Sequence, residues 1–315
     1  MKTLEHLATG NTTTSDAQAN FLPTKWSDYI IQYSNPLMYF EQLCIVNNEL
    51  VGKDGSSIRV PIRSNNLTFT ATTSESTART MTKIDNLTTV LLEPSLFKYG
   101  ATLSEQYIIE SRVDMIKEAL DQLVKWRALA VDTAVLTELE TASTNQIYGG
   151  DATSDATLAT GDVMTTELVA KARRYLRDND FGMNEAGSPE MVLVINPKDE
   201  EQFLKDSQFV NAAEYGSNEI ILNGEIGKLK YIGVRVLVTT RLNDYTNSGD
   251  SWGVDGHRCV LVDPGYAAVI AWKMPARFDK EWMKDEGMWK FYLDMMFDVK
   301  LGQDKAIVLI DVTDA

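Results

Sequence analysis

Residues 103–140, LSEQYIIESRVDMIKEALDQLVKWRALAVDTAVLTELE, contain no Pro or Gly and carry apolar side chains at steps of three or four residues. That spacing places the apolar side chains on one face of an α-helix. Ser104 followed by Glu105 is typical of a helix start. At about 1.5 Å per residue such a helix is roughly 50 Å long, which is unusual in a globular domain. The predicted buried face consists of Ile109, Val113, Ile116, Leu120, Val124, Ala128, Val131, Val135 and Leu139.

The segments before this helix have a different composition. Residues 1 to about 20 are rich in Thr, Ser, Ala and Asn and poor in apolar side chains, which predicts a flexible arm. Between residues 48 and 90 β-branched residues recur, with alternation at Ile58, Val60 and Ile62, which predicts a long hairpin. An isolated two-stranded hairpin is only marginally stable in water, so we expect this one to rest on another surface.

After residue 165 the pattern becomes one of alternating helices and strands. It predicts a helix at 165–180, a buried strand at 190–196 and a second helix at 198–209. Five strands are then expected: one at 234–242, two joined at the Asp263–Pro264–Gly265 turn, and two more in the C-terminal segment around a turn at Gly302. The C-terminal half is therefore expected to contain an α/β lobe.

Composition excludes several classes of protein. The chain has 315 residues and a net charge of −15, which argues against a surface that binds nucleic acid as a whole. The two cysteines, Cys44 and Cys259, are far apart in apolar surroundings and are expected to be small buried residues, outside any disulfide or metal site. Neither a membrane-spanning run nor a secretory signal is expected, which indicates a chain of cytosolic origin.

Three closely spaced glycines, Gly224, Gly227 and Gly233, resemble a nucleotide-binding loop at first sight. A dinucleotide fingerprint needs G-x-G-x-x-G at the start of a helix, whereas a strand is expected after Gly233. A phosphate-binding loop needs G-K-[ST], whereas Gly227–Lys228 is followed by Leu229. We therefore interpret the three glycines as structural turn residues.

No arrangement of residues typical of catalysis is found. The G-x-S-like stretch around Ser251 lies in a polar loop, and His257 is expected in a loop beside it, with no third member of a triad indicated. Asp151, Asp155 and Asp162 are too irregularly spaced for a calcium loop. We expect no catalytic, cofactor-binding or metal-binding residues and no enzymatic activity.

The order of the predicted elements resembles the major capsid protein of tailed phages and archaeal tailed viruses, which has the Hong Kong 97 fold. The segment from Tyr215 and Gly216 through Asn223 to Gly233 is similar to the part of that family that crosses its axial lobe. PTKWSDYI (23–30) and ALAVDTAVLTEL (128–139) are similar to one subfamily of coat proteins. No one of these motifs is diagnostic, but their order is.

The resemblance implies an α+β fold of the Hong Kong 97 type, divided into five parts. Residues 1–48 would form an N-terminal arm and residues 49–90 an extended loop. Residues 91–160 would form a peripheral domain with a spine helix, and residues 161–275 an axial domain. The strands of residues 276–315 would return to the peripheral domain.

The resemblance also implies a structural protein without cofactors that self-assembles through hexamers and pentamers. The icosahedral shell would enclose double-stranded DNA without sequence-specific binding, with a portal and possible scaffold or decoration proteins as partners and no membrane. The protein would belong to the virion and assemble in the host cytoplasm. Five residues of the extended loop are the implied contacts between copies: Lys53, Asp54, Arg59, Arg63 and Arg79.

Two other classes of protein stay open from the sequence. One is a nanocompartment shell similar to an encapsulin, which uses the same fold to enclose an enzyme. The other is an unrelated α/β enzyme with a β-ribbon insertion. A capsid and a nanocompartment differ in their neighbouring genes, and an enzyme would form a small oligomer instead of a shell.

Overall fold

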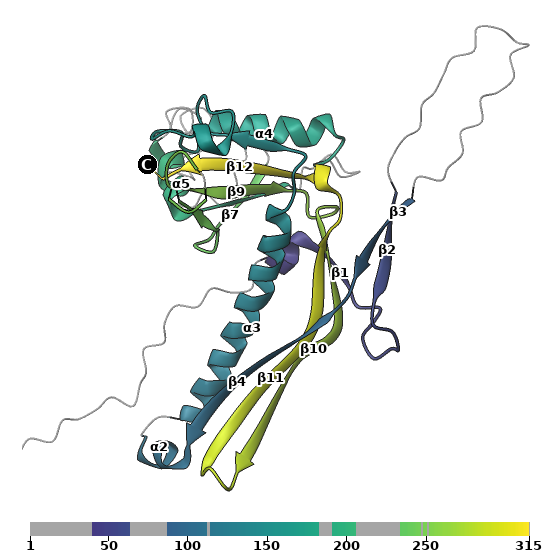
Figure 1. Ribbon diagram of the computed structural model, residues 1–315, viewed down its shortest axis with the longest axis vertical. Helices are drawn as coiled ribbons and strands as arrows, with labels where there is room; N and C mark the ends of the chain where they lie inside the picture. The colour runs from purple at the N-terminus through teal and green to yellow at the C-terminus, as the bar shows by residue number, and fades with distance from the viewer. Residues whose placement is uncertain are drawn as a thin grey trace, which may run out of the picture.

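Two β-sheets and one long helix organise the chain in the computed structural model (Figure 1). Residues 40–63, 87–111, 114–182, 191–205, 234–246, 248–250 and 252–314 are described. The helix α3 (Met115–Glu140) runs from α2 (Glu105–Glu110) to the lobe that contains the six-stranded sheet (Figure 1). Within the described ranges no helix is long and apolar enough to cross a membrane.

The four-stranded sheet lies along α3 and has the order β1-β10-β11-β4. Its strands are β1 (Cys44–Asn47), β10 (Ala268–Met283), β11 (Met288–Leu301) and β4 (Ser95–Ser104). Every second residue of β11 from Phe291 to Val299 is buried, as expected for a strand with one face on the core. β10 and β11 form a hairpin whose turn includes Gly287 at φ 61°, a conformation that favours glycine.

The predicted single helix from residue 103 is wrong, because the chain forms two helices. The hydroxyl of Ser104 accepts a hydrogen bond from the Tyr107 N–H at 3.2 Å, which confirms Ser104 as an N-cap, but of the short helix α2. The backbone is extended at Ser111, and the carboxylate of Asp114 accepts hydrogen bonds from the Ile116 and Lys117 N–H groups to start α3. Asp favours a cap over a helix interior because its side chain competes for backbone N–H groups.

The predicted buried face is correct in the C-terminal half of α3 and partly correct in its N-terminal half, where Ile116 and Leu120 are half-buried against the cluster around Leu123. Val131, Val135 and Leu139 are fully buried in the main core, as predicted. In the N-terminal half Leu123 is fully buried against Phe291 of β11, whereas Val124 is 51% exposed. The two halves of α3 pack against different partners, the C-terminal half in the main core and the N-terminal half against Phe291 and Leu293 of β11. Ile109, on α2, is exposed.

The six-stranded sheet has the order β5-β12-β9-β6-β7, with β8 paired to β9. Its five-residue strand β6 and seven-residue strand β12 are buried along their whole length, which requires cover on both faces of the sheet. In Figure 1 α4 and α5 lie beside this sheet. The bounds are β5 (Gln146–Tyr148), α4 (Thr166–Asp178), β6 (Met191–Ile195), α5 (Pro197–Lys205), β7 (Val234–Val238), β8 (Asp244–Tyr245), β9 (Gly256–Val262) and β12 (Ile307–Thr313), with short 3-10 helices η2 (Asp155–Thr157) and η3 (Asp304–Ala306).

The last strand differs from the expected path. β11 lies in the sheet beside α3, but β12 pairs with β5 and β9 in the six-stranded sheet. The expectation that all strands of residues 276–315 return to the peripheral part is therefore wrong for β12. Its apolar residues at 307–310 and 312 suit a strand buried on both faces and do not suit the half-exposed sheet beside α3.

The predicted hairpin is confirmed for its described strands, β2 (Ile58–Arg63) and β3 (Leu87–Leu92), which pair antiparallel. It projects from the body on the side away from α3 (Figure 1). Its base rests on β10, where Leu92 packs against Val269 and Ala271 and the Lys273 Nζ donates to the Gly55 carbonyl at 2.7 Å. The hairpin is therefore supported by the four-stranded sheet. This agrees with the expectation that an isolated two-stranded hairpin is too weakly stable to stand alone.

The end of the predicted N-terminal arm belongs to the core. Phe40 and Leu43 of the 3-10 helix η1 (Phe40–Leu43) are buried, and β1 pairs in parallel with β10. Residues 40–47 of the predicted arm therefore pack against the body of the subunit, with Phe40 and Leu43 in the same buried cluster as Val131 and Val135 of α3. The rest of the predicted arm, residues 1–39, lies outside the described residues.

Candidate contact surfaces and a buried polar cluster

The described residues place three of the five implied contact residues on the surface. Lys53 and Asp54 are exposed in the turns before β2, and Arg59 is exposed within β2. Arg59 lies between Ile58 and Val60, which pack against the cluster around Leu92, so its side chain faces away from that support. Arg63 ends β2, and Arg79 lies outside the described residues, as do the three glycines Gly224, Gly227 and Gly233.

An apolar groove separates α3 from β4 on the surface of the molecule. Its volume is about 790 Å³. Trp126 of α3 and Tyr99 of β4 face each other across it with ring centroids 6.1 Å apart, and Leu129 is 48% exposed. The exposed side chains of Trp126 and Leu129 make this groove a candidate contact surface. The groove is lined by Phe97, Lys98, Tyr99, Gly100, Trp126, Leu129, Ala130, Thr133 and Ala134.

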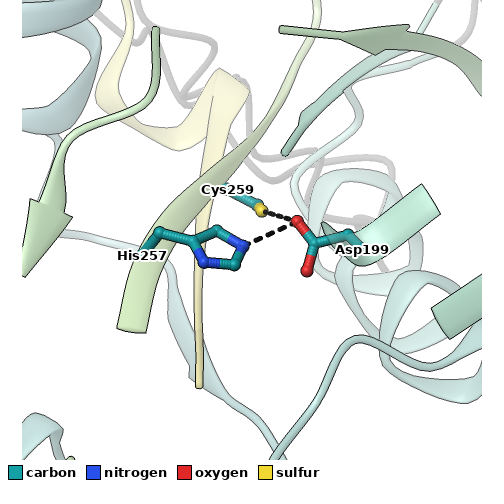
Figure 2. Close-up of side chains that lie close together, drawn as sticks. All are labelled: Asp199, His257 and Cys259. Atoms are coloured by element: carbon teal, nitrogen blue, oxygen red, sulfur yellow. Dashed lines mark hydrogen bonds and ion pairs between the residues drawn. The ribbon is translucent and has the colours of Figure 1, made fainter. Parts of the chain in front are cut away.

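A cluster of three polar side chains is buried inside the lobe of the six-stranded sheet (Figure 2). His257 and Cys259 are two residues apart on β9, so that they lie on one face of the strand, and Asp199 lies in the first turn of α5. The Asp199 Oδ2 lies 2.7 Å from the His257 Nε2 and 3.1 Å from the Cys259 Sγ. The expectation of His257 in a loop is wrong: it belongs to β9 and is fully buried. Ser251 lies outside the described residues.

The His257 ring lies between two carboxylates. Its Nδ1 is 3.0 Å from the Asp314 Oδ1, and its Nε2 faces Asp199. A neutral imidazole has only one N–H, so two such contacts favour the doubly protonated ring. Burial lowers the pKa of His257, but the hydrogen bonds and charges of the two carboxylates together outweigh burial and raise it. The cluster therefore joins α5, β9 and the C-terminal segment.

Cys259 is held as a thiol in this arrangement. Burial, followed by the Asp199 charge, raises the pKa of the Cys259 thiol well above its usual value. Because only the thiolate is an effective nucleophile, the cluster is unsuited to nucleophilic catalysis. Its imidazole, thiol and carboxylate are, however, ligand types that bind divalent transition metals.

A second polar cluster joins the loop after β5 to the strands β9 and β12. The Arg258 guanidinium donates to Asp311 through Nε at 2.6 Å and through the terminal Nη2 at 2.9 Å, and the same Nη2 lies 3.7 Å from Asp155. The guanidinium also lies over the stacked rings of Tyr245 and Trp252, at 5.2 and 5.9 Å from their centroids. One cation is thus shared by two carboxylates and an aromatic pair.

The Asp155 carboxyl titrates in a biologically accessible range. Burial, then the hydrogen bond and charge of Asp311, raise its pKa from 3.8 to about 6, against the opposing charge of Arg258. A raised pKa means that the folded state binds the proton more tightly than the unfolded state. The resulting stability is fully present below about pH 3.8 and is lost as the pH rises through about 6.

Asp155→Asn is expected to remove the loss of stability at high pH, because the neutral amide imitates the protonated carboxyl. At about pH 8 the variant should be more stable than the natural chain by about 1 kcal/mol, a value reduced for the 38% exposure of the side chain. At about pH 4.5 this advantage should be clearly smaller, because the folded-state carboxyl is then mostly protonated, and it should vanish below about pH 3.8. Urea unfolding of unassembled subunits at both pH values measures the difference, and a variant with no advantage at the higher pH would contradict the assignment. Asp151→Asn removes the same charge from an exposed site in the same loop as a control.

Sequence reasoning missed both clusters. The spacing His257-x-Cys259 within an apolar run is the one local signal, because it places both side chains on one face of a strand. Their partner, Asp199, is separated from them by about sixty residues and lies on a helix that carries several other acidic side chains. Pairing of that kind depends on the packing of α5 against β9, which no local pattern specifies.

Comparison with solved structures identifies the fold as the Hong Kong 97 type. The capsid of Ralstonia phage GP4 matches with a TM-score of 0.71 and 15% identity, over 98% of this chain and 99% of that one. The capsid of cyanophage P-SCSP1u matches with a TM-score of 0.74 and 14% identity, over 99% of both chains. The head structure of Helicobacter pylori bacteriophage KHP40 matches with a TM-score of 0.68 and 14% identity, over 97% of this chain and all of that one. No curated protein matches the sequence.

The sequence itself matches a family model as well. The model describes a phage capsid protein and matches residues 88–310, from the start of β3 into β12. The chain belongs to this family of phage capsid proteins. It is a structural major capsid protein of the virion.

Proposed function

We propose that copies of this chain assemble through hexamers and pentamers into a closed icosahedral shell around double-stranded DNA. The match of residues 88–310 to the phage capsid family carries this proposal, and the capsid structures with the same fold support it. Assembly takes place in the host cytoplasm, with a portal and scaffold or decoration proteins as partners. The shell encloses the DNA without reading its sequence, in keeping with the net charge of −15.

The five-part division of the chain is part of the same proposal. Residues 1–48 serve as the arm, 49–90 as the extended loop and 91–160 as the peripheral domain. Residues 161–275 serve as the axial domain, and the strands after 276 complete the peripheral sheet, except for β12. The location of α3, β4 and β11 on one side and of β6, β7 and β9 on the other supports the two main divisions.

The contacts between copies are proposed to depend on complementary charge. The extended loop carries the exposed Lys53 and Arg59 together with Arg63 and Arg79, and it is proposed to lie across an acidic surface of the neighbouring copy. Complementary charges of this kind fix the register of an interface and speed its formation more than they add affinity. Asp54 pairs with a basic side chain at the same contact. Closed symmetric shells require such a patch to meet a different patch on the next copy.

No enzymatic activity and no cofactor belong to this proposal. His257 and Asp155, whose pKa values are raised, take part in clusters that join elements of the fold, and Cys259 is a thiol inside a strand. An encapsulin-like compartment would use the same fold around an enzyme cargo. The family match favours the virion.

Electron microscopy of the purified chain, together with size-exclusion chromatography, tests the proposed shell. Closed particles tens of nanometres across, or hexamer and pentamer rings, are expected. The double variant Lys53→Glu, Arg59→Glu is expected to reduce closed particles strongly, because it reverses the charge of the hairpin at two exposed positions. Lys171→Glu changes an exposed lysine of α4 in the same way and should leave assembly intact. A monomer or dimer at every salt and protein concentration would refute the proposal.

A further inference from the structure

We propose that Asp199, His257 and Cys259 form a binding site for one structural zinc-class divalent cation inside the lobe of the six-stranded sheet. The three ligand atoms, one from each side chain, all lie within 4.8 Å of one another (Figure 2). All three side chains are buried, so solvent does not compete for the position between them. This inference is independent of shell assembly and concerns the single subunit.

The geometry is close to that of a coordinated ion. Zinc lies about 2.0–2.1 Å from imidazole nitrogen and carboxylate oxygen and about 2.3 Å from thiolate sulfur, with tetrahedral angles. Those bonds separate nitrogen from oxygen by roughly 3.3 Å and sulfur from oxygen by roughly 3.6 Å. The corresponding distances in the structure are 2.7 and 3.1 Å. Side-chain shifts of about half an ångström therefore admit the ion.

Two protons occupy the place that the ion would take. The Nε2–H of His257 and the S–H of Cys259 both point to the Asp199 Oδ2. On binding, the imidazolium loses its Nε2 proton, the thiol becomes a thiolate, and both protons leave to solvent as the divalent ion enters. A thiolate and a carboxylate then balance the two positive charges, which is the condition for a charge buried in the protein interior.

The surroundings of the three ligands suit a metal site. The Nδ1–H of His257 donates to Asp314 at 3.0 Å, and a carboxylate in that role orients a metal-bound imidazole and increases its basicity. Asp314 is itself held by the Lys198 Nζ at 2.5 Å. The Asn196 N–H donates to the Asp199 Oδ2 at 3.0 Å and fixes that carboxylate at the start of α5.

The ligand set selects the class of ion. Thiolate and imidazole favour Zn²⁺ and Co²⁺ over Mg²⁺ and Ca²⁺, which take oxygen ligands. Three protein ligands leave the fourth position of a four-coordinate site to one water, which would be enclosed in the lobe together with the ion. Because the cluster is enclosed by α5, β9 and the C-terminal segment, we expect the ion to be taken up during folding and to exchange slowly afterwards.

The test uses the full chain without an affinity tag, purified from zinc-supplemented cells and also refolded with one equivalent of Zn²⁺ or Co²⁺. One ion per chain by elemental analysis is expected, together with a thiolate-to-cobalt charge-transfer band in the near ultraviolet. Cys259→Ser should lose that band and at least tenfold in affinity. Cys44→Ser, which alters the other buried cysteine, should retain both.

The natural chain alone can overturn the proposal, even if Cys259→Ser fails to fold. Refolded natural protein that binds less than a tenth of an equivalent of Zn²⁺ and shows no cobalt–thiolate band would leave the cluster as a hydrogen-bonded structural contact. A band of equal strength in Cys259→Ser would place the metal elsewhere and would equally refute the site.

Discussion

Asp132→Ala is expected to lower the free energy of unfolding of the subunit by about 3 kcal/mol or more. Asp132 is a fully buried residue of α3, and its carboxylate accepts a hydrogen bond from the Phe40 N–H at 3.0 Å. The Arg241 guanidinium, whose side chain is only 9% exposed, forms an ion pair with the same carboxylate. The substitution removes a carboxylate that two segments of the chain share inside the core, which is far more costly than the loss of a surface ion pair.

Urea unfolding of unassembled subunits measures this effect. Glu138→Ala is the matched control, since Glu138 also lies on α3 and pairs across the fold with Lys300, but both side chains are partly exposed. The control should cost less than about 1 kcal/mol. The double variant Asp132→Ala, Arg241→Met should recover part of the loss, because it removes the buried cation as well. Equal losses from Asp132→Ala and Glu138→Ala would contradict the assigned role.

Leu123→Ala is expected to cost about 2–5 kcal/mol, whereas Val124→Ala should change stability by less than about 0.5 kcal/mol. Leu123 is fully buried against Phe291, and the neighbouring Val124 is 51% exposed. Leu and Ala differ little in helix propensity, whereas Val→Ala gains a few tenths of a kcal/mol, so helix propensity does not explain the loss expected from Leu123→Ala.

The same unfolding experiment distinguishes the two possible faces of α3. A larger loss from Val124→Ala than from Leu123→Ala would restore the face that the apolar spacing predicts. Far-ultraviolet circular dichroism of both variants checks that α3 persists, so that a loss in Leu123→Ala reports the cavity and not the helix.

Much of the fold can be predicted from local patterns. Helix α4 and strand β6 follow the expected apolar spacing, and Ser104 is an N-cap as its position beside Glu105 indicates. Each of these elements is determined by residues close together in the sequence, so its local pattern is enough to predict it. The strands of the hairpin, β2 and β3, were likewise indicated by their alternation.

Features that depend on a partner could not be predicted. The burial of Leu123 instead of Val124 follows from the strand that packs against that half of α3, and the sheet of β12 follows from its neighbours β5 and β9. For the buried cluster, the spacing of His257 and Cys259 was visible, but Asp199 becomes their neighbour only through the packing of α5.

The continuity of the main core determines how the subunit responds to force. Residues of both sheets, such as Val260 of β9 and Phe297 of β11, belong to one buried cluster, and α3 packs against both sheets. Bending the subunit between its two sheets would therefore expose packed apolar surface to water. The subunit is for this reason expected to resist bending. In the proposed shell, the different curvatures around fivefold and sixfold positions must then be absorbed at the contacts between copies, and not inside this core.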